Sequence, residues 1–388
     1  MTSFERRTRR AQSRLDAVGA DALALTPGQD CYYLTGVDGE QSDRLQLLLV
    51  PAEGDPTVVA PTLEAESVRE ATWVGDVRTW DDDEGPWPVL DPLLETLSPS
   101  RVLLADQMWA QFSLAFHDHL PDASFGLASE ALSPLRQRKD GRELDALRAA
   151  GEAADATMRD VRALGADAVG MTEAELADFV EERLEAHGGT GVAFETIVGA
   201  GPNGADPHHV SGEREIRAGD PVVLDFGTRV DAYPSDQTRT VVFDGEPSAE
   251  FQRVHDVVRE AQSRAVAAVA PGATAGAVDR AAREVIEEAG YGERFVHRTG
   301  HGVGLDVHEA PDVVAGSETE LEPGMVFSVE PGVYLPGEFG VRIEDLVVVS
   351  DSEKPRSSDR EMRRTSGSRR QSGAGVERLN HTDRRWRC

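Results

Sequence analysis

Two strand–turn–strand segments in the second half of the chain narrow the possible folds most, because acidic residues interrupt their apolar strands. In the first, the β-like runs 222–228 and 238–243 flank a polar stretch with a proline, which predicts a hairpin. Asp225 and Asp236 lie about equally far from its turn, so adjacent antiparallel strands would bring both carboxylates to one side. Carboxylates in that position repel unless a cation lies between them.

The same arrangement recurs near residue 340. Apolar runs 327–334 and 340–348 flank a turn-forming stretch, and Glu330 and Glu344 are again about equally far from it. In a chain with 70 acidic residues, any single one is most simply explained as facing solvent. The recurrence of the pair favours a metal site instead, since an unpartnered buried carboxylate is costly.

Two histidine-containing segments add candidate ligands. His301 lies between glycines in the stretch 297–311, and these glycines are expected to let the backbone approach a ligand closely. His208 and His209 follow a proline in the stretch 201–209, and on its own this pair is more simply explained as part of a surface loop. No GxGxxG or GK[ST] pattern follows a strand here, so a phosphate-binding loop is disfavoured. Four carboxylates with one neutral imidazole balance two divalent cations, and a nitrogen ligand favours Mn, Co, Zn or Fe over Mg.

Composition excludes some partners and indicates an environment. The 388 residues hold 40 basic and 70 acidic side chains, for a net charge of −30, so nucleic acid and anionic membranes are poor partners. Only two of the basic residues, Lys139 and Lys354, are lysines. Excess carboxylate with scarce lysine predicts a halophilic cytoplasm, and GC-rich coding is the alternative explanation. Two cysteines, no bilayer-length apolar run and no visible signal peptide predict a cytoplasmic protein without a disulfide framework.

The pattern along the chain predicts three parts. Residues 1–134 alternate short strands and helices, which indicates a small α/β domain. Residues 135–352 combine long helical patterns with β-rich segments, and Thr172 with Glu175 forms a capping-box signature at the start of one helix. Residues 353–388 are rich in Arg, Ser and Gly and poor in aliphatics, which predicts a basic, disordered tail.

With these residues in view, the chain resembles the pita-bread metallopeptidases, a family that includes Xaa-Pro dipeptidase (prolidase) and Xaa-Pro aminopeptidase. The order Asp225, Asp236, His301, Glu330 and Glu344 matches the family's five metal ligands, and the segment 297–309 resembles its histidine-centred signature. The resemblance implies an α/β creatinase/prolidase-like N-terminal domain followed by an α+β pita-bread catalytic domain. It also implies hydrolysis of the bond before proline, and a homodimer.

The resemblance also implies roles for individual residues. Asp236 and Glu344 would bridge two divalent metal ions, Asp225 would bind one of them, and His301 with Glu330 would bind the other. Glu330 would also move the proton of a water that attacks the carbonyl before proline. The other expected catalytic residues are His208, favoured over His209, and His308, and Arg342 is a weaker candidate for substrate binding.

Two departures from the family pattern and two other functions stay open. Asp312 stands where many prolidases have arginine, so the cation that would recognise a dipeptide's carboxylate is not expected at this position. These residues do not distinguish a dipeptidase from an aminopeptidase. The basic tail replaces the usual end of the last strand, which could weaken packing beside the site. A non-catalytic pita-bread binding module and a metal-independent creatinase-like hydrolase are the alternatives, and both are disfavoured by the complete ligand set.

Overall fold

The chain divides into two units, Met1–Arg136 and Gln137–Cys388. The structure, a computed structural model, describes residues 1–351 and 375–388. The boundary expected after residue 134 lies close to this division.

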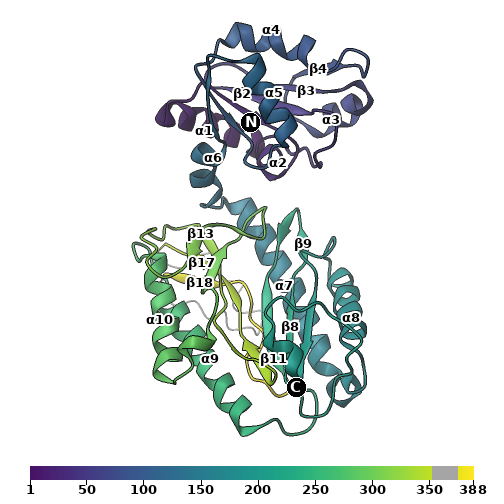
Figure 1. Cartoon of the computed structure of the whole chain (residues 1–388), viewed down its shortest axis with the longest axis vertical. Helices are drawn as coiled ribbons and strands as arrows, with labels where there is room; N and C mark the ends of the chain where they lie inside the picture. The colour runs from purple at the N-terminus through teal and green to yellow at the C-terminus, as the bar shows by residue number, and fades with distance from the viewer. Residues whose placement is uncertain (352–374) are drawn as a thin grey trace, which may run out of the picture. The chain divides into compact units, whose positions relative to one another are not determined.

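The first unit is built on a six-stranded mixed sheet with the order β4-β3-β2-β1-β5-β6 (Figure 1). β1 is antiparallel to β2 and parallel to β5, as expected for an α/β domain. Its strands are β1 (Ala22–Leu25), β2 (Leu47–Pro51), β3 (Thr57–Pro61), β4 (Asp76–Trp80), β5 (Arg101–Leu104) and β6 (Ser124–Leu127). Its helices are α1 (Ser3–Val18), α2 (Gln29–Thr35), η1 (Thr62–Glu64), α3 (Ala65–Ala71), α4 (Trp87–Leu97), α5 (Ala110–His119) and α6 (Ser129–Arg136).

The second unit has two halves, each a sheet covered by a pair of helices (Figure 1). In the first half, α7 and α8 pack their apolar faces on the sheet β11-β8-β7, and Met158, Val180 and Leu224 belong to one core cluster. Its elements are α7 (Gly141–Ala163), η2 (Gly165–Ala168), α8 (Glu173–Ala186), β7 (Ile197–Ala200), η3 (Gly201–Ala205), β8 (Val222–Phe226), β9 (Arg229–Val230), β10 (Tyr233–Pro234) and β11 (Gln237–Val241).

In the second half, α9 and α10 cover the sheet β13-β12-β14-β17-β18, and Val254 and Val278 belong to the same core cluster as Phe327. Its elements are α9 (Ala249–Ala267), α10 (Ala275–Glu288), η4 (Gly292–Arg294), β12 (Gly300–Gly302), β13 (Glu309–Val313), β14 (Val326–Val329), β15 (Gly332–Leu335), β16 (Phe339–Arg342), β17 (Asp345–Val349) and β18 (Val376–Arg378). This α+β architecture is the expected one.

Capping residues fix where the long helices of the second unit begin. The predicted capping box is present at α8, where the Thr172 hydroxyl accepts from Glu175 N and the Glu175 carboxylate accepts from Thr172 N. Asp140 and Glu143 form a second capping box at α7. These caps satisfy the first free N–H groups of the two helices that support the first sheet.

The end of the chain differs from the expected disordered tail. Residues 353–374 lie outside the described residues, but β18 pairs with the edge of β17, and Val376 and Leu379 are buried. The ring of Trp386 packs edge-to-face on Phe251. The expectation of disorder is therefore wrong for residues 375–388, because a few well-placed apolar side chains are enough to dock a short strand on an open sheet edge.

Across residues 1–351 and 375–388, no helix is both long and apolar enough to cross a membrane.

Candidate metal centre

The first expected hairpin is present, with a register that differs slightly from the expected one. β8 and β11 are antiparallel, and Asp225 lies opposite Thr238. Asp236 lies two residues before Thr238, so it is a diagonal neighbour of Asp225 instead of its direct partner. Because side chains alternate along a strand, positions 236 and 238 project to the same side.

The second hairpin has the expected register. Val329 lies opposite Asp345 and Gly332 opposite Arg342, so the same register places Glu330 opposite Glu344. The ladder is interrupted at this point, between β14 and β15 on one strand and between β16 and β17 on the other. Pro331 has no N–H to donate, which favours such an interruption directly after Glu330.

His301 reaches this region from β12, a short strand between β13 and β14. A Cβ atom at Gly300 would collide with the carbonyl oxygen of Ser328, and one at Gly302 with that of Ala310. The flanking glycines were expected to admit a ligand close to the backbone. In the structure they let β12 pass close to its neighbours, which fixes the position of the imidazole between them.

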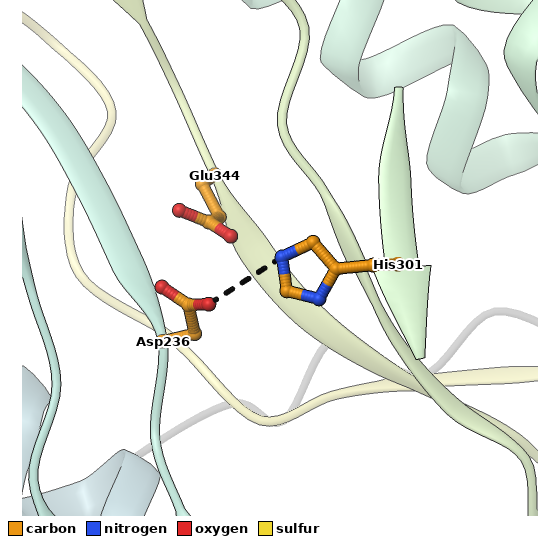
Figure 2. A group of neighbouring side chains, drawn as sticks. All are labelled: Asp236, His301 and Glu344. Atoms are coloured by element: carbon orange, nitrogen blue, oxygen red, sulfur yellow. Dashed lines mark ion pairs between the residues drawn. The ribbon is translucent and has the colours of Figure 1, made fainter. Parts of the chain in front are cut away.

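Three side chains from separate elements converge at the centre of the site. Asp236, His301 and Glu344 are buried, and one potential ligand atom from each lies within 4.8 Å of the others (Figure 2). Nε2 of His301 lies 3.7 Å from Oδ2 of Asp236 and 3.3 Å from Oε1 of Glu330. The predicted ligands of both hairpins and β12 therefore meet at one place.

Two of the carboxylates are poorly compensated by the protein. Burial, followed by repulsion from Asp225, raises the pKa of Asp236 well above its usual range. Burial and the negative charges of Asp236 and Glu330 do the same to the pKa of Glu344. A low-dielectric site that crowds carboxylates in this way favours a bound cation.

The two remaining carboxylates each have a cationic neighbour. Oδ2 of Asp225 accepts a 2.6 Å hydrogen bond from Arg342. Burial alone would raise the pKa of Glu330, but the hydrogen bond and charge of His301 outweigh it and lower the pKa to about 2. Burial opposes charging of His301, yet Glu330 and Asp236 raise its pKa overall.

One orphaned atom supports a metal at this place. Among the described residues, Oδ1 of Asp225 is buried and has no hydrogen-bond partner. Such an atom is costly to leave unpaired, and a cation would satisfy it. The oxygen-rich donor set with one imidazole suits a divalent ion that tolerates nitrogen, so the residues present fit a metal centre.

Arg342 lies deeper than expected for a residue that binds substrate. It is 4% exposed, and its guanidinium donates to Tyr334 Oη at 2.8 Å, to Thr238 Oγ1 at 3.1 Å and to Asp225. Tyr334 Oη in turn lies 2.9 Å from Nε2 of His297. These contacts make Arg342 a support for a candidate ligand, and its role in substrate binding stays a prediction.

The two histidines expected in catalysis, His208 and His308, are both exposed, and His308 lies beside a candidate ligand. The ring of His308 packs perpendicular to that of His301, with centroids 4.1 Å apart. Partial burial and the charge of His301 lower the pKa of His308, with a smaller contribution from His208. His209 is directed elsewhere: its Nε2 lies 2.8 Å from the buried carboxylate of Glu173.

Several supporting residues were missed by the sequence analysis. Thr238 donates to Glu344 Oε2 at 2.7 Å, and Ser328 donates to Glu330 Oε1 at 3.1 Å. The buried Arg239 donates to the carbonyl oxygen of Glu344 and to the Asp345 carboxylate. Thr238 and Arg239 give no local signal of such contacts, because their partner Glu344 lies about a hundred residues further along the chain. Ser328 lies only two residues before Glu330, but a serine within an apolar strand does not by itself indicate that contact.

Asp312, where arginine was expected from the resemblance, has a partner within the signature segment 297–309. Its carboxylate forms an ion pair with Arg298, two residues before the turn into β12. The position thus carries a charge that is already compensated, instead of a free cation for a substrate carboxylate.

A carboxylate-rich centre with one imidazole, set between two sheet-and-helix halves, is typical of metal-dependent hydrolases. The model of metallopeptidase family M24 matches residues 145–351, and that of the creatinase/prolidase N-terminal domain matches residues 7–138. The chain belongs to metallopeptidase family M24 and carries a creatinase-type N-terminal domain. The predicted family and fold are therefore confirmed.

The similarity to known proteins covers most of the chain. A probable dipeptidase PepE of Mycobacterium bovis is 43% identical over 352 residues, covering 90% of this chain and 92% of the relative. An Xaa-Pro dipeptidase of Lactobacillus helveticus is 38% identical, covering 82% and 87%. The crystal structure of a prolidase from Thermococcus sibiricus superposes with a TM-score of 0.87 at 37% identity, covering 99% of this chain and 98% of that one.

Proposed function

We propose that this chain is a metal-dependent peptidase that hydrolyses the peptide bond before proline. The observation that carries the proposal is the buried convergence of Asp236, His301 and Glu344, with Glu330 beside them. Family membership supports metal-dependent peptide hydrolysis, and the similarity to an Xaa-Pro dipeptidase and a prolidase supports the substrate class.

The site would hold two divalent ions, drawn from Mn, Co, Zn and Fe. Asp236 and Glu344 would help to hold both ions, since these are the two carboxylates that the protein compensates least. Asp225, through its orphaned Oδ1, would bind one ion, and His301 with Glu330 would bind the other. The choice of ion follows from the single nitrogen ligand.

The side chains of the chain divide the remaining work. Bound divalent ions supply Lewis acidity and lower the pKa of water at the site. Glu330, kept as a carboxylate by His301, accepts the proton of the attacking water and delivers it to the leaving proline nitrogen. His208 and His308 donate to the oxygen of the tetrahedral state, where new negative charge develops.

The proposed substrate suits this division. The bond before proline is a tertiary amide without an N–H, so an active site that holds the substrate through that donor would fail. Polarising the carbonyl oxygen does not require the donor.

Removal and return of metal tests the proposal. Protein stripped with a chelator should not hydrolyse Ala-Pro, and activity should return with at least one of Mn, Co, Zn or Fe. Asp225→Ala should lose both metal content and activity, whereas a binding module would keep its partner affinity. No turnover with any of these ions, at low or high salt, would exclude the proposed activity.

We favour a dipeptidase over an aminopeptidase, because the relatives reported above are named dipeptidase or prolidase. Faster hydrolysis of Ala-Pro than of Ala-Pro-Ala is expected. The opposite ranking would agree with the compensated charge at Asp312, which leaves no free cation there for a substrate carboxylate.

The proposed setting is a salt-rich cytoplasm and the proposed assembly a homodimer. The net charge of −30 and the near absence of lysine support salt adaptation. Measuring activity and molecular mass across a salt series tests both: activity that falls steadily as salt rises, or a monomer at every salt concentration, would count against them.

A further inference from the structure

The residues that directly follow the two exposed histidines are both held by buried charges. Behind His208, the side chain of His209 meets Glu173, whose own side chain is fully buried. Behind His308, the side chain of Glu309 meets Lys139, whose side chain is also fully buried. The two pairs come from different parts of the chain, and each includes the residue that directly follows a proposed catalytic histidine.

Glu173 gathers the loop that carries His208. Its carboxylate accepts hydrogen bonds from Ala200 N at 2.7 Å, Asn203 Nδ2 at 3.0 Å and Gly212 N at 3.3 Å, in addition to the contact with His209 Nε2 at 2.8 Å. These donors span both ends of the loop. Because a buried carboxylate with several donors has one favourable geometry, the loop backbone around His208 is fixed from its inner side.

Lys139 acts on the segment that carries His308. Its Nζ lies 2.5 Å from Oε1 of Glu309, and its backbone N–H donates to the carbonyl oxygen of Gly324 at 2.9 Å. The Glu309 carboxylate packs so closely on Gly304 that a Cβ atom there would collide with it. Glu309 is thus held between the ammonium and the backbone of the loop that joins His301 to His308.

The composition of the chain points to the same lysine. Thirty-eight of its basic residues are arginines, so a lysine at a fully buried ion pair is an exception that needs a local reason. An ammonium is a compact point charge, whereas a guanidinium is wider and presents a planar fork of donors. A fully enclosed site against Glu309 accepts the first and not the second.

Resting on the proposed function, we propose that Glu173–His209 and Lys139–Glu309 are two positioning pairs that hold His208 and His308 toward the substrate oxygen. Neither pair would touch the reacting atoms. Each would fix the backbone of the preceding histidine, whose own side chain is exposed.

Lys139→Arg and Glu173→Gln are the primary variants, with Arg148→Lys as the matched control. Arg148 forms a half-exposed ion pair with Glu377, so it tests a basic-residue exchange away from the site. Each primary variant should lower kcat for Ala-Pro about ten- to a hundredfold, because small displacements of a catalytic group are costly. KM and bound metal should change less than about twofold, since the displaced histidine would contact the substrate oxygen mainly in the transition state. The control should keep its kcat.

Imidazole nitrogen NMR of the metal-loaded enzyme supplies a readout independent of turnover. Lys139→Arg should shift the His308 resonances and leave those of His208 in place, and Glu173→Gln should do the reverse. If Glu173→Gln does not fold, His209→Ala removes the same pair from its more exposed side, and a normal kcat in that variant would overturn the first pair.

The outcomes separate this inference from the proposed function. A wild-type enzyme that hydrolyses no Xaa-Pro peptide contradicts the proposed function itself. If the wild type is active and His208→Ala and His308→Ala lose activity, unchanged kcat in Lys139→Arg and Glu173→Gln overturns the positioning pairs. A loss that appears equally in kcat, metal content and thermal stability would show a merely structural role and would overturn them as well.

Discussion

The two hairpins that build the centre share a plan and differ in register. In the second, Glu330 and Glu344 fall at opposed positions of an interrupted ladder, whereas in the first Asp236 is displaced by two residues from the partner of Asp225. Each hairpin nevertheless contributes one carboxylate that is paired with a cationic side chain and one carboxylate that, among the described residues, has no cationic partner of its own. The lesson is that the placement of positive charge, and not the spacing of the acids, separates the two members of each pair.

This difference agrees with the proposed ligand roles. Asp225 is paired with Arg342 and Glu330 with His301, so each resembles half of a buried ion pair. Asp236 and Glu344 remain under repulsion from their neighbours, and they are the residues expected to bridge two cations. Substitutions in the two classes should therefore affect the metal-free protein in opposite directions.

Asp236→Asn should have the largest effect on activity. Loss of this proposed metal ligand is expected to lower kcat/KM for Ala-Pro by at least about a thousandfold, the scale of several kcal/mol of lost metal stabilisation. The same change removes one of several crowded negative charges, so the metal-free protein should gain about 1 kcal/mol of stability. Activity assays and denaturant unfolding with and without metal measure both effects. A less stable metal-free variant would contradict the comparison.

Asp225→Asn should do the opposite to the metal-free protein. It leaves the 4%-exposed Arg342 without its carboxylate, and breaking a buried pair from one side costs about 3 kcal/mol. Denaturant unfolding of the stripped protein measures this cost. The double variant with Arg342→Met should recover part of it, because both charges are then absent. If Asp225→Asn and Asp236→Asn shift stability in the same direction, the two classes of carboxylate are not distinct.

The sequence predicted the candidate ligands far better than it predicted the residues that hold them in place. Acids inside apolar strands stand out, and His301 stands out between glycines, so the sequence could indicate the side chains that meet in the structure, Asp236, His301 and Glu344. The ligand roles of all five candidate residues stay predictions. Glu173 and Thr238 could not, because in a chain with 70 acids a buried glutamate looks like a surface one until the loop that covers it is known. The order in residues 375–388 was missed because docking of β18 depends on the exposed edge of β17, which local composition does not describe.

Thr238→Val and Ser328→Ala should sharpen the comparison at the level of single hydroxyls. Thr238 donates to Glu344 and accepts from Arg342, whereas Ser328 donates to Glu330 and accepts from His301 N. Each change leaves a buried group without that partner, at a cost of about 1 to 2 kcal/mol. Thermal unfolding should show this loss of stability, and kcat/KM should fall about tenfold. Thr240→Val, one alternation further along β11, is the control for a buried hydroxyl away from the carboxylates; an equal loss of activity there would remove the distinction.

His255 tests whether a buried polar side chain without a hydrogen-bond partner affects stability outside the two hairpins. It lies in α9 at 1% exposure, and neither ring nitrogen has a hydrogen-bond partner among the described residues. Burial, with Arg259 and Arg162 nearby, lowers its pKa to about 3 from 6.5. Between these values the unfolded chain binds more protons, so stability is full above pH 6.5 and falls toward pH 3, by up to about 1.4 kcal/mol per pH unit from this group. His255→Leu should flatten that slope between pH 6.5 and 5 without losing stability at pH 7. Parallel slopes for the variant and the wild type in urea unfolding would show that His255 does not contribute to the acid sensitivity of this unit.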